Sequence, residues 1–289
     1  MNAWTDLGGG IFVRQSRAFR MNSVALLARE HAVLVDPGVL PSELDDIAAR
    51  VRDANPAQVT LFITHAHWDH VLGRSWWPAA GVIAHDRFPA DLERTMAWVH
   101  EEAETIASKH GESWPRRFES FRPTERVAGL HFRRIGPWRA VFRDAFGHSA
   151  SQLSLHLPEA RVLIAADMLS DIEIPMLETQ PPVYRATLEA LRPLFEGGAI
   201  ETLVPGHGTI ARGVDAAGDR FRRDLAYLET LERETRRLHA GGASLADAQA
   251  RLSTVADVER HPHHPMREIH LENIQHAYKG IDAASRPHR

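Results

Sequence analysis

Apolar residues in the first part of the chain fall into short runs separated by turn-forming residues. The runs at residues 11–13, 23–28 and 32–35 are rich in aliphatic side chains and are bounded by Gly, Asn and Asp-Pro-Gly, which predicts three β-strands. Residues 42–53 carry apolar side chains on one helical stripe, and residues 59–63 form a fully apolar run. This order of strands and helix predicts a buried β-sheet with a helix packed on it.

Short apolar runs return later in the chain and predict a second set of strands. The runs occupy residues 126–135, 138–143, 152–157, 161–166 and 200–204. A helix is predicted at residues 183–195, before the last of these strands. Between the two sets lies a polar, helix-favouring stretch, residues 86–122, which we interpret as an insertion. From about residue 213 the pattern is helical, and it ends in a helix at 266–279. We therefore divide the chain into a sheet-containing domain, residues 1–212, and a helical C-terminal region, residues 213–289.

Composition narrows the kinds of protein that this chain can be. Its 289 residues are 44% hydrophobic, and its formal net charge is −4. Without an excess of basic residues, we expect no nucleic-acid partner. The chain has no cysteine, which excludes disulfides, thiolate metal ligands and cysteine nucleophiles. No apolar run approaches the roughly 20 residues that span a bilayer, and the N-terminus does not resemble a signal peptide, so we expect a cytoplasmic protein with no membrane partner.

Histidine is the outlying residue type, with 18 copies. Four metal-competent side chains follow directly on the apolar run at 59–63, namely His65, His67, Asp69 and His70. On an extended chain His65 and His67 point to the same side, and the other two follow as the chain turns. Imidazole nitrogen and carboxylate oxygen suit Zn²⁺, and also Fe or Mn. A surface histidine cluster without a metal is the alternative, but such clusters rarely lie at the mouth of a core strand.

Three further candidates occupy the same kind of position. His148, Asp167 and His207 each follow closely on one of the later apolar runs. Each alone is ordinary turn chemistry. Together they repeat one arrangement, a nitrogen or oxygen ligand where a core strand ends, and active sites are often assembled from such loops.

With these residues the chain resembles the metallo-β-lactamase-fold hydrolases. The motif His-x-His-x-Asp-His is complete at residues 65–70, and the later single ligands follow in the family's order. The resemblance covers about residues 8–212. It implies an α/β fold, an αββα sandwich of two packed mixed β-sheets flanked by helices. The helical insertion and the helical C-terminal extension would be additions to this catalytic domain.

The resemblance also implies two metal ions that share one carboxylate. The residues that would hold the first ion, the second ion and both are, in that order, His65, His67 and His148; Asp69, His70 and His207; and Asp167. Asp36 matches an acidic residue that the family places after an early strand. It would either orient a ligating imidazole or form a plain Asp-Pro-Gly turn.

Such a site implies a dinuclear metal-dependent hydrolase. Two divalent ions, which we expect to be Zn²⁺, lower the pKa of a shared water, so that a metal-bound hydroxide attacks an ester, thioester or lactone bond of a small molecule. Asp69 and Asp167 are the expected catalytic carboxylates, and a free oxygen of Asp69 would orient the hydroxide or relay its proton. Two alternatives stay open: an oxidoreductase similar to the mononuclear iron persulfide dioxygenases of this family, and a non-catalytic metal-binding module.

The residues that select the substrate carry weaker signals. Trp68 lies inside the metal motif, and Trp76 and Trp77 follow it, so we expect all three to line the pocket. The insertion carries ring side chains that would either close a lid over the metals or pack within the insertion. They are Trp98, His100, His110, Trp114 and Phe118.

The predicted helix at 266–279 places His270 and Asn273 on one face, beside an apolar stripe. One hypothesis is that this face borders the metal cleft, so that His270 contacts the substrate or the loop that holds it. The alternative is ordinary helix packing, with His270 bonded to the backbone. The histidine- and proline-rich tract at residues 261–265 is typical of a solvated linker. The sequence does not specify an oligomeric state.

Overall fold

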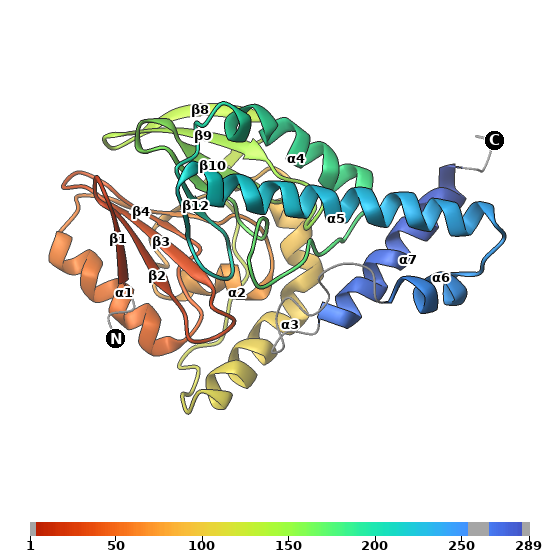
Figure 1. Ribbon diagram of the computed structural model, residues 1–289. Helices are drawn as coiled ribbons and strands as arrows, with labels where there is room; N and C mark the ends of the chain where they lie inside the picture. The colour runs from red at the N-terminus through yellow and green to blue at the C-terminus, as the bar shows by residue number, and fades with distance from the viewer. Residues whose placement is uncertain (1–3, 254–265, 285–289) are drawn as a thin grey trace.

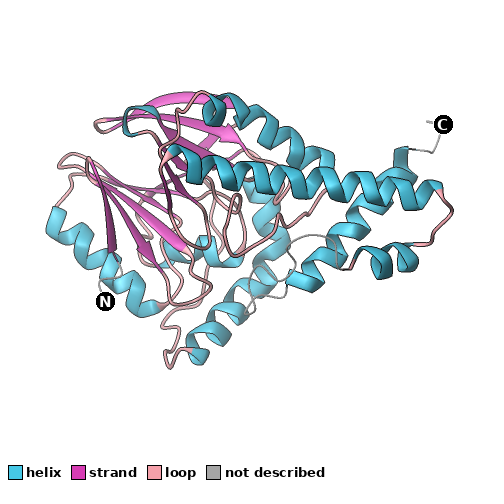
Figure 2. Ribbon diagram, viewed as in Figure 1, coloured by secondary structure: helices cyan, strands magenta, loops and turns pink. Residues whose placement is uncertain are grey.

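The computed structural model describes residues 4–253 and 266–284, so the tract at 261–265 lies outside the described residues. Two β-sheets pack face to face, and helices cover their outer faces (Figure 1, Figure 2). Side chains from both sheets form the core between them, and the rings of Phe62 and Phe142 meet edge to face there, with centroids 5.0 Å apart. This architecture confirms the predicted αββα sandwich.

The first sheet has seven strands, whose order in the sheet follows their order in the chain. They are β1 (Trp4–Gly8), β2 (Ile11–Gln15), β3 (Asn22–Leu27), β4 (Ala32–Val35), β5 (Val59–Phe62), β6 (Gly81–His85) and β7 (Glu125–Val127). The first four strands pair antiparallel, whereas β4 to β7 run parallel. The parallel pair β4–β5 needs a crossover, which α1 (Pro41–Ala54) supplies. All of β4 is buried, because the sheet is covered on both faces.

The second sheet has six strands, in the order β13-β12-β11-β10-β9-β8. In chain order they are β8 (Leu130–Ile135), β9 (Trp138–Asp144), β10 (Leu153–Leu157), β11 (Val162–Ile164), β12 (Thr202–Val204) and β13 (Ala211–Arg212). All neighbouring pairs are antiparallel except β11–β12, which is parallel. The crossover between these two strands contains α4 (Pro181–Glu196). Both sheets are therefore mixed.

Helices form the two outer layers. Besides α1 and α4, the helical elements are α2 (Trp68–Val71), η1 (Leu72–Ser75), α3 (Phe88–Lys109), η2 (Pro158–Ala160), α5 (Val214–Ala240), α6 (Leu245–Leu252) and α7 (Met266–Ala284). Leu44 of α1 and Leu92 of α3 share a core with Leu61 of the first sheet, and Ile274 of α7 shares one with Leu163 of the second. In Figure 1, α5, α6 and α7 extend beyond the sheets. None of the described helices is long and apolar enough to cross a membrane.

Two predicted elements differ from the structure. The run at 126–135 was expected to be one strand, but it divides at Gly129, whose φ of +67° takes the chain out of the extended conformation. As a result β7 pairs with β6 in the first sheet and β8 pairs with β9 in the second. The insertion at 86–122 contains a single helix, α3, followed by an irregular segment. In addition, β1 precedes the first predicted strand.

Candidate metal centre

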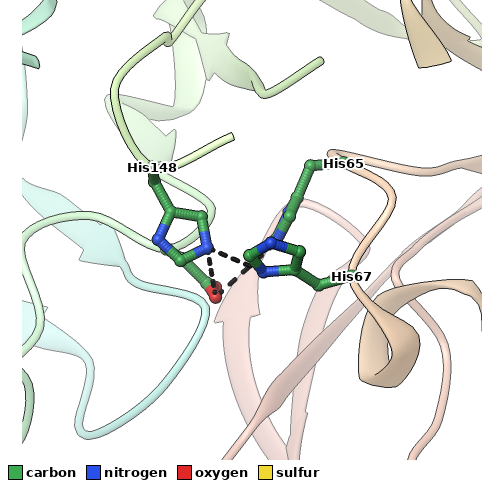
Figure 3. A group of neighbouring side chains, drawn as sticks. His65, His67 and His148 are labelled. Carbon is green, nitrogen blue, oxygen red and sulfur yellow. Dashed lines mark hydrogen bonds and ion pairs between the residues drawn. The ribbon is translucent and has the colours of Figure 1, made fainter. Parts of the chain in front are cut away.

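The densest group of candidate ligands lies directly after β5. Residues 63–67 leave the buried end of this strand as an extended loop, and α2 begins immediately afterwards. His65 and His67 therefore lie on one side of the loop, with ring centroids 4.5 Å apart. Figure 3 shows their rings converging with that of His148, which comes from a different loop. The local motif thus meets a residue from the β9–β10 loop of the second sheet.

A first group of candidate ligand atoms, all within 4.8 Å of one another, belongs to His65, His67, His148 and Asp167. His148 Nε2 lies 3.0 Å from His67 Nδ1 and 3.2 Å from Asp167 Oδ2. His65 Nε2 lies 3.7 Å from the same carboxylate oxygen. The loops after β9 and β11 therefore bring His148 and Asp167 to the motif after β5.

A second group, again within 4.8 Å, consists of Asp69, His70 and His207. His207 Nε2 lies 3.2 Å from Asp69 Oδ2. Asp167 joins this group as well, because its Oδ1 lies 3.2 Å from His70 Nε2 while its Oδ2 faces His148 of the first group. All seven side chains singled out in the sequence thus come together, with Asp167 between the two groups.

This donor set fits a pair of divalent cations. His65 Nε2, His70 Nε2 and Asp167 Oδ1 are buried, and none of them makes a well-aligned hydrogen bond among the described residues, although His70 Nε2 and Asp167 Oδ1 face each other at 3.2 Å. Buried polar atoms without partners destabilise a fold. A cation in each group would satisfy them, since imidazole nitrogen and carboxylate oxygen are ligands of Zn²⁺, Fe and Mn.

Hydrogen bonds on the outer side of the motif orient two of its imidazoles. Asp36 Oδ2 accepts from His70 Nδ1 at 2.8 Å and from the Thr64 hydroxyl at 2.6 Å. Thr64 Oγ1 in turn lies 3.0 Å from His65 Nδ1 and accepts from it, because its own proton is given to Asp36. In the neutral form of each ring, these contacts place the proton on Nδ1 and direct a lone pair of Nε2 toward the centre. Asp36 is buried, which raises its pKa, and its contacts are those of an orienting group rather than of a plain turn.

Two further contacts of this kind were not indicated by the sequence. Glu178 Oε1 accepts a hydrogen bond from His67 Nε2 at 2.9 Å, which leaves Nδ1 facing the first group. Burial would raise the pKa of Glu178, but this hydrogen bond and the charges of His67 and His148 together outweigh burial and lower the pKa. His207 Nδ1 donates to the backbone oxygen of Phe19 at 3.0 Å. Glu178 lies in an irregular segment just ahead of α4, where no periodic pattern distinguishes it.

The charges of the two groups strongly influence one another. Burial lowers the pKa of His65 well below its usual value. For His70 burial acts in the same direction, but the carboxylates of Asp167 and Asp69 outweigh it and raise the pKa well above the usual value. Asp167 shows the converse, because burial would raise its pKa and the surrounding histidines lower it well below its usual value. Asp167 is therefore ionised at neutral pH, which is the form in which a carboxylate binds metal ions.

Helix α3 anchors the two loops that carry the histidines of the first group. Thr95 Oγ1 donates to the backbone of the loop after β5 at 2.9 Å. The buried carboxylate of Asp91 accepts hydrogen bonds from Ser149 Oγ at 2.7 Å and from Ser151 Oγ, which lie in the loop between β9 and β10. The segment predicted as an insertion thus supports the site from outside.

A cavity of about 450 Å³ lies beside the two groups. Asp69, Asp167 and His207 line it, and so does Trp68 from the metal motif. Glu173, which the sequence did not single out, is another lining residue, and burial raises its pKa to about 7. A molecule bound in this cavity would meet the candidate ligands with one end.

The remaining aromatic candidates divide between the cavity and the core. Trp98 of α3 lines the cavity. The expectation for Trp76 and Trp77 is wrong, because both are partly buried against the core shared by α1, α3 and the first sheet and neither lines the cavity. The Trp76 ring lies 5.4 Å from that of Trp114, which is buried there together with Phe118. Of the insertion's aromatic residues, Trp98 therefore borders the cavity, whereas Trp114 and Phe118 pack in the core.

His270 and Asn273 lie on α7 but do not line the cavity. His270 is buried, with Nδ1 2.8 Å from the Tyr227 hydroxyl and Nε2 2.8 Å from the backbone oxygen of Leu252. The hypothesis that His270 contacts a substrate therefore gives way to one of packing between α5, α6 and α7. Asn273 reaches further, because its side chain donates to the backbone oxygen of Pro175 at 2.6 Å, and Pro175 lines the cavity.

The fold and the paired ligand groups define an αββα protein with a shared His/Asp centre at its strand ends. The family model of the metallo-beta-lactamase superfamily matches residues 17–207, a range that includes every candidate ligand. The chain belongs to the metallo-beta-lactamase superfamily. Among curated protein sequences, none matches it.

Several solved structures share this fold. A stereoselective inverting sec-alkylsulfatase from Pseudomonas sp. has a TM-score of 0.67 at 14% identity, over 99% of this chain and 52% of the alkylsulfatase. The chain thus spans about half the length of that enzyme. A beta-lactamase domain protein from Burkholderia ambifaria has a TM-score of 0.67 at 18% identity, over 97% and 88% of the two chains. A metallo-beta-lactamase from Pontibacter korlensis has a TM-score of 0.55 at 14% identity, over 78% and 98%.

Proposed function

We propose that this protein is a dinuclear metal-dependent hydrolase that acts on an ester, thioester or lactone bond of a small molecule. One observation carries the proposal: two groups of candidate ligands share Asp167 beside a cavity that admits a small molecule. Membership of the metallo-beta-lactamase superfamily supports a metal-dependent hydrolase in general terms. The proposed bond type follows from the chemistry of the site, and the experiment below tests it.

Each group would hold one ion, for which we expect Zn²⁺. His65, His67 and His148 would bind the first ion, and Asp69, His70 and His207 the second. Asp167 would bind both. When bound, two divalent ions lower the pKa of a water toward neutrality and polarise the carbonyl under attack. Asp36, Thr64 and Glu178 would keep the imidazoles in the tautomers that such binding requires.

Asp69 would be the carboxylate that handles the attacking water. It lines the cavity, and its Oδ2 lies 3.2 Å from His207 Nε2. Burial would raise the pKa of Asp69, but the charge of His70 and the hydrogen bond from His207 outweigh it and lower the pKa. An ionised carboxylate at this place accepts a hydrogen bond from a water in the cavity and so orients it toward the substrate.

The second group of ligands favours this proposal over a mononuclear iron dioxygenase. A single iron would use one group only and would leave His70 and His207 without a ligand role. A non-catalytic binding module has no need of a cavity beside its metal ligands. The two groups and the cavity together therefore support a hydrolase.

Metal analysis of the purified protein, combined with initial rates on matched ester, thioester, lactone and phosphodiester substrates, tests the proposal. We expect two zinc ions per chain and hydrolysis of a carbonyl substrate that is lost on chelation and restored by zinc. One iron per chain with oxygen uptake would contradict the proposal and support the dioxygenase. Two bound ions without hydrolysis of any of the four substrate types would support the binding module.

The pH dependence of metal binding provides a second test. A histidine must be neutral to bind a metal ion. Zinc affinity should therefore fall as the pH drops, and the second group should lose its ion first, because the raised pKa of His70 lets a proton compete there above the ordinary histidine pKa of about 6.5. An affinity that stays constant from about pH 8 to about pH 5 would argue against histidine ligands.

A further inference from the structure

The wall of the cavity away from the candidate ligands is largely apolar. Its apolar side chains come from the β2–β3 turn, α2, α3, the segment after β11 and α7, and include Phe19, Trp68, Trp98, Ile174, Met266 and Ile269. Phe19 and Trp98 are 36% and 59% exposed, so they lie where the cavity opens to solvent. The Phe19 ring meets that of Trp68 edge to face, with centroids 5.9 Å apart. Apolar side chains that remain exposed around a cavity mark a ligand site.

Apart from the candidate ligands, the side chains that line the cavity and ionise near neutral pH all carry carboxyl groups. Glu173, Glu178 and Asp224 line the cavity, and no lysine or arginine does so within residues 4–253 and 266–284. Arg94 of α3 is ion-paired with Asp91 instead. A carboxylate or phosphate on this part of a substrate would lose hydration and find no cationic side chain in return. A hydrocarbon group would gain from the same burial.

Helix α7 closes one side of the cavity. Met266 is buried and Ile269 is partly buried, and both line the cavity. One turn further along, Asn273 donates to the backbone oxygen of Pro175 and accepts from the backbone nitrogen of Leu177 at 3.0 Å. These bonds hold the segment after β11 against α7. The position of this wall therefore depends on the C-terminal helix.

We propose that the cavity selects substrates whose non-reacting part is uncharged and apolar, and that Ile269 limits how long this part can be. The substrate class is then a neutral ester, thioester or lactone with a hydrocarbon chain. Each added methylene should raise kcat/KM by about fourfold until the chain reaches the wall. The proposal rests on the proposed function for the hydrolysis itself, whereas the selectivity depends only on the wall.

A matched pair of esters tests the charge preference of the zinc-loaded enzyme. The compounds p-nitrophenyl hexanoate and mono-p-nitrophenyl adipate have acyl chains of the same length, and only the adipate ends in a carboxylate. We expect the hexanoate to be preferred by about tenfold or more in kcat/KM. Ile269→Arg should shift this ratio toward the adipate. Glu268→Arg, which places the same side chain on an exposed position of α7 about 100° round the helix from Ile269, should leave the ratio unchanged.

Binding of a neutral apolar dye, N-phenyl-1-naphthylamine, tests the wall without relying on catalysis. Ile269→Trp fills the cavity from α7 and should weaken dye binding by about tenfold. Arg267→Trp introduces the same bulk at an exposed position two residues earlier, on the opposite side of the helix, and should leave dye binding as in the wild type.

The two measurements separate the failure of the selectivity from the failure of the proposed function. Hydrolysis that favours the adipate, or dye binding that Ile269→Trp leaves intact, would overturn the selectivity and leave the hydrolase standing. If neither ester is cleaved, dye binding shows whether the cavity is an apolar binding site. Loss in Ile269→Trp but not in Arg267→Trp would then support an apolar site in a protein that does not hydrolyse these esters, and no dye binding at all would overturn the inference.

Discussion

The floor and the wall of the cavity are built in opposite ways. The floor, by which we mean the seven candidate ligands, of which His65 and His70 lie beneath the cavity surface, comes from loops at the ends of β5, β9, β11 and β12. The outer nitrogens of His65, His67 and His70 each have a polar partner there. The wall, by contrast, is largely apolar and comes mainly from α3, the segment after β11 and α7. The sheets therefore position the candidate ligands, while α3 and α7 carry much of the apolar wall.

The two regions also differ in how tightly they are packed. A Cβ atom at Gly206 would lie 1.9 Å from Asp167 Oδ1, so the floor has no room for a side chain at that position. On the wall, Trp98 is 59% exposed and Ile269 is partly exposed. Substitutions in the floor should therefore abolish metal binding or turnover, whereas substitutions in the wall should change which substrates are used.

The largest effect is expected for Asp167→Ala, which removes the carboxylate shared by both groups. Its two oxygens lie 3.2 Å from His70 Nε2 and from His148 Nε2. We expect metal content and turnover to fall together, by more than the roughly 100-fold that loss of an orienting group costs. Elemental analysis and kcat/KM measure this, with circular dichroism to show that the fold is retained. Glu229→Ala, at an exposed position of α5, is the matched control. Full occupancy by two metals in Asp167→Ala would show that Asp167 is not a shared ligand.

A smaller effect is expected for the groups that orient the histidines. Asp36→Asn should weaken zinc binding by about 10- to 100-fold, measured by competition with a chelator. Glu178→Gln should cost less, because the Glu178 side chain is 38% exposed and that of Asp36 is 3% exposed. Solvent can replace a lost hydrogen bond at an exposed position more easily than at a buried one. The reverse order of the two variants would show that the first group, rather than the second, is the more sensitive to its outer partners.

Substitutions on α7 should separate the wall from the floor. Asn273→Leu leaves the buried Leu177 N–H and the Pro175 carbonyl without their side-chain partner, at about 1–3 kcal/mol for each group left unsatisfied. We expect a higher KM for apolar esters, a lower melting temperature and two bound metals. His270→Ala should lower the melting temperature alone, because His270 bonds only to Tyr227 and Leu252 in the described structure. Lower specific activity of correctly folded His270→Ala would reinstate a role in the cleft.

The smallest effect concerns the pH dependence of stability through Asp91. Burial would raise the pKa of Asp91, but hydrogen bonds from Ser151 and Ser149 and the ion pair with Arg94 outweigh burial and lower it. A carboxyl group with a lowered pKa stabilises the folded state above its unfolded pKa of about 3.9, and this contribution is lost as the pH falls through the folded value. Asp91→Asn should therefore cost about 1–3 kcal/mol at neutral pH and less in acid. Urea unfolding of chelator-treated protein across pH checks this, and a difference that grows in acid would contradict the sign.

Much of the floor could be predicted because its signals are local. His65, His67, Asp69 and His70 lie within one short segment, and each remaining ligand follows an apolar run. Apolar runs predict buried strands, and the loops at strand ends in a layered α/β fold gather along one edge. The sandwich fold and the convergence of these side chains therefore follow from short-range patterns and from the family that they resemble.

The sequence by itself determined which residues gather at the strand ends and that helices flank two sheets. Only the tertiary structure decided that the run at 126–135 divides between the sheets, that Glu178 bonds to His67, and which way His270 points. Glu178 and His67 are 111 positions apart, and an irregular segment has no period from which such a contact could be inferred. His270 lies on a helix enclosed by α5 and α6, so burial on several sides obscures which face meets the cavity. The periodicity of a sequence indicates that a side chain is buried. Long-range packing decides which residues it is buried against.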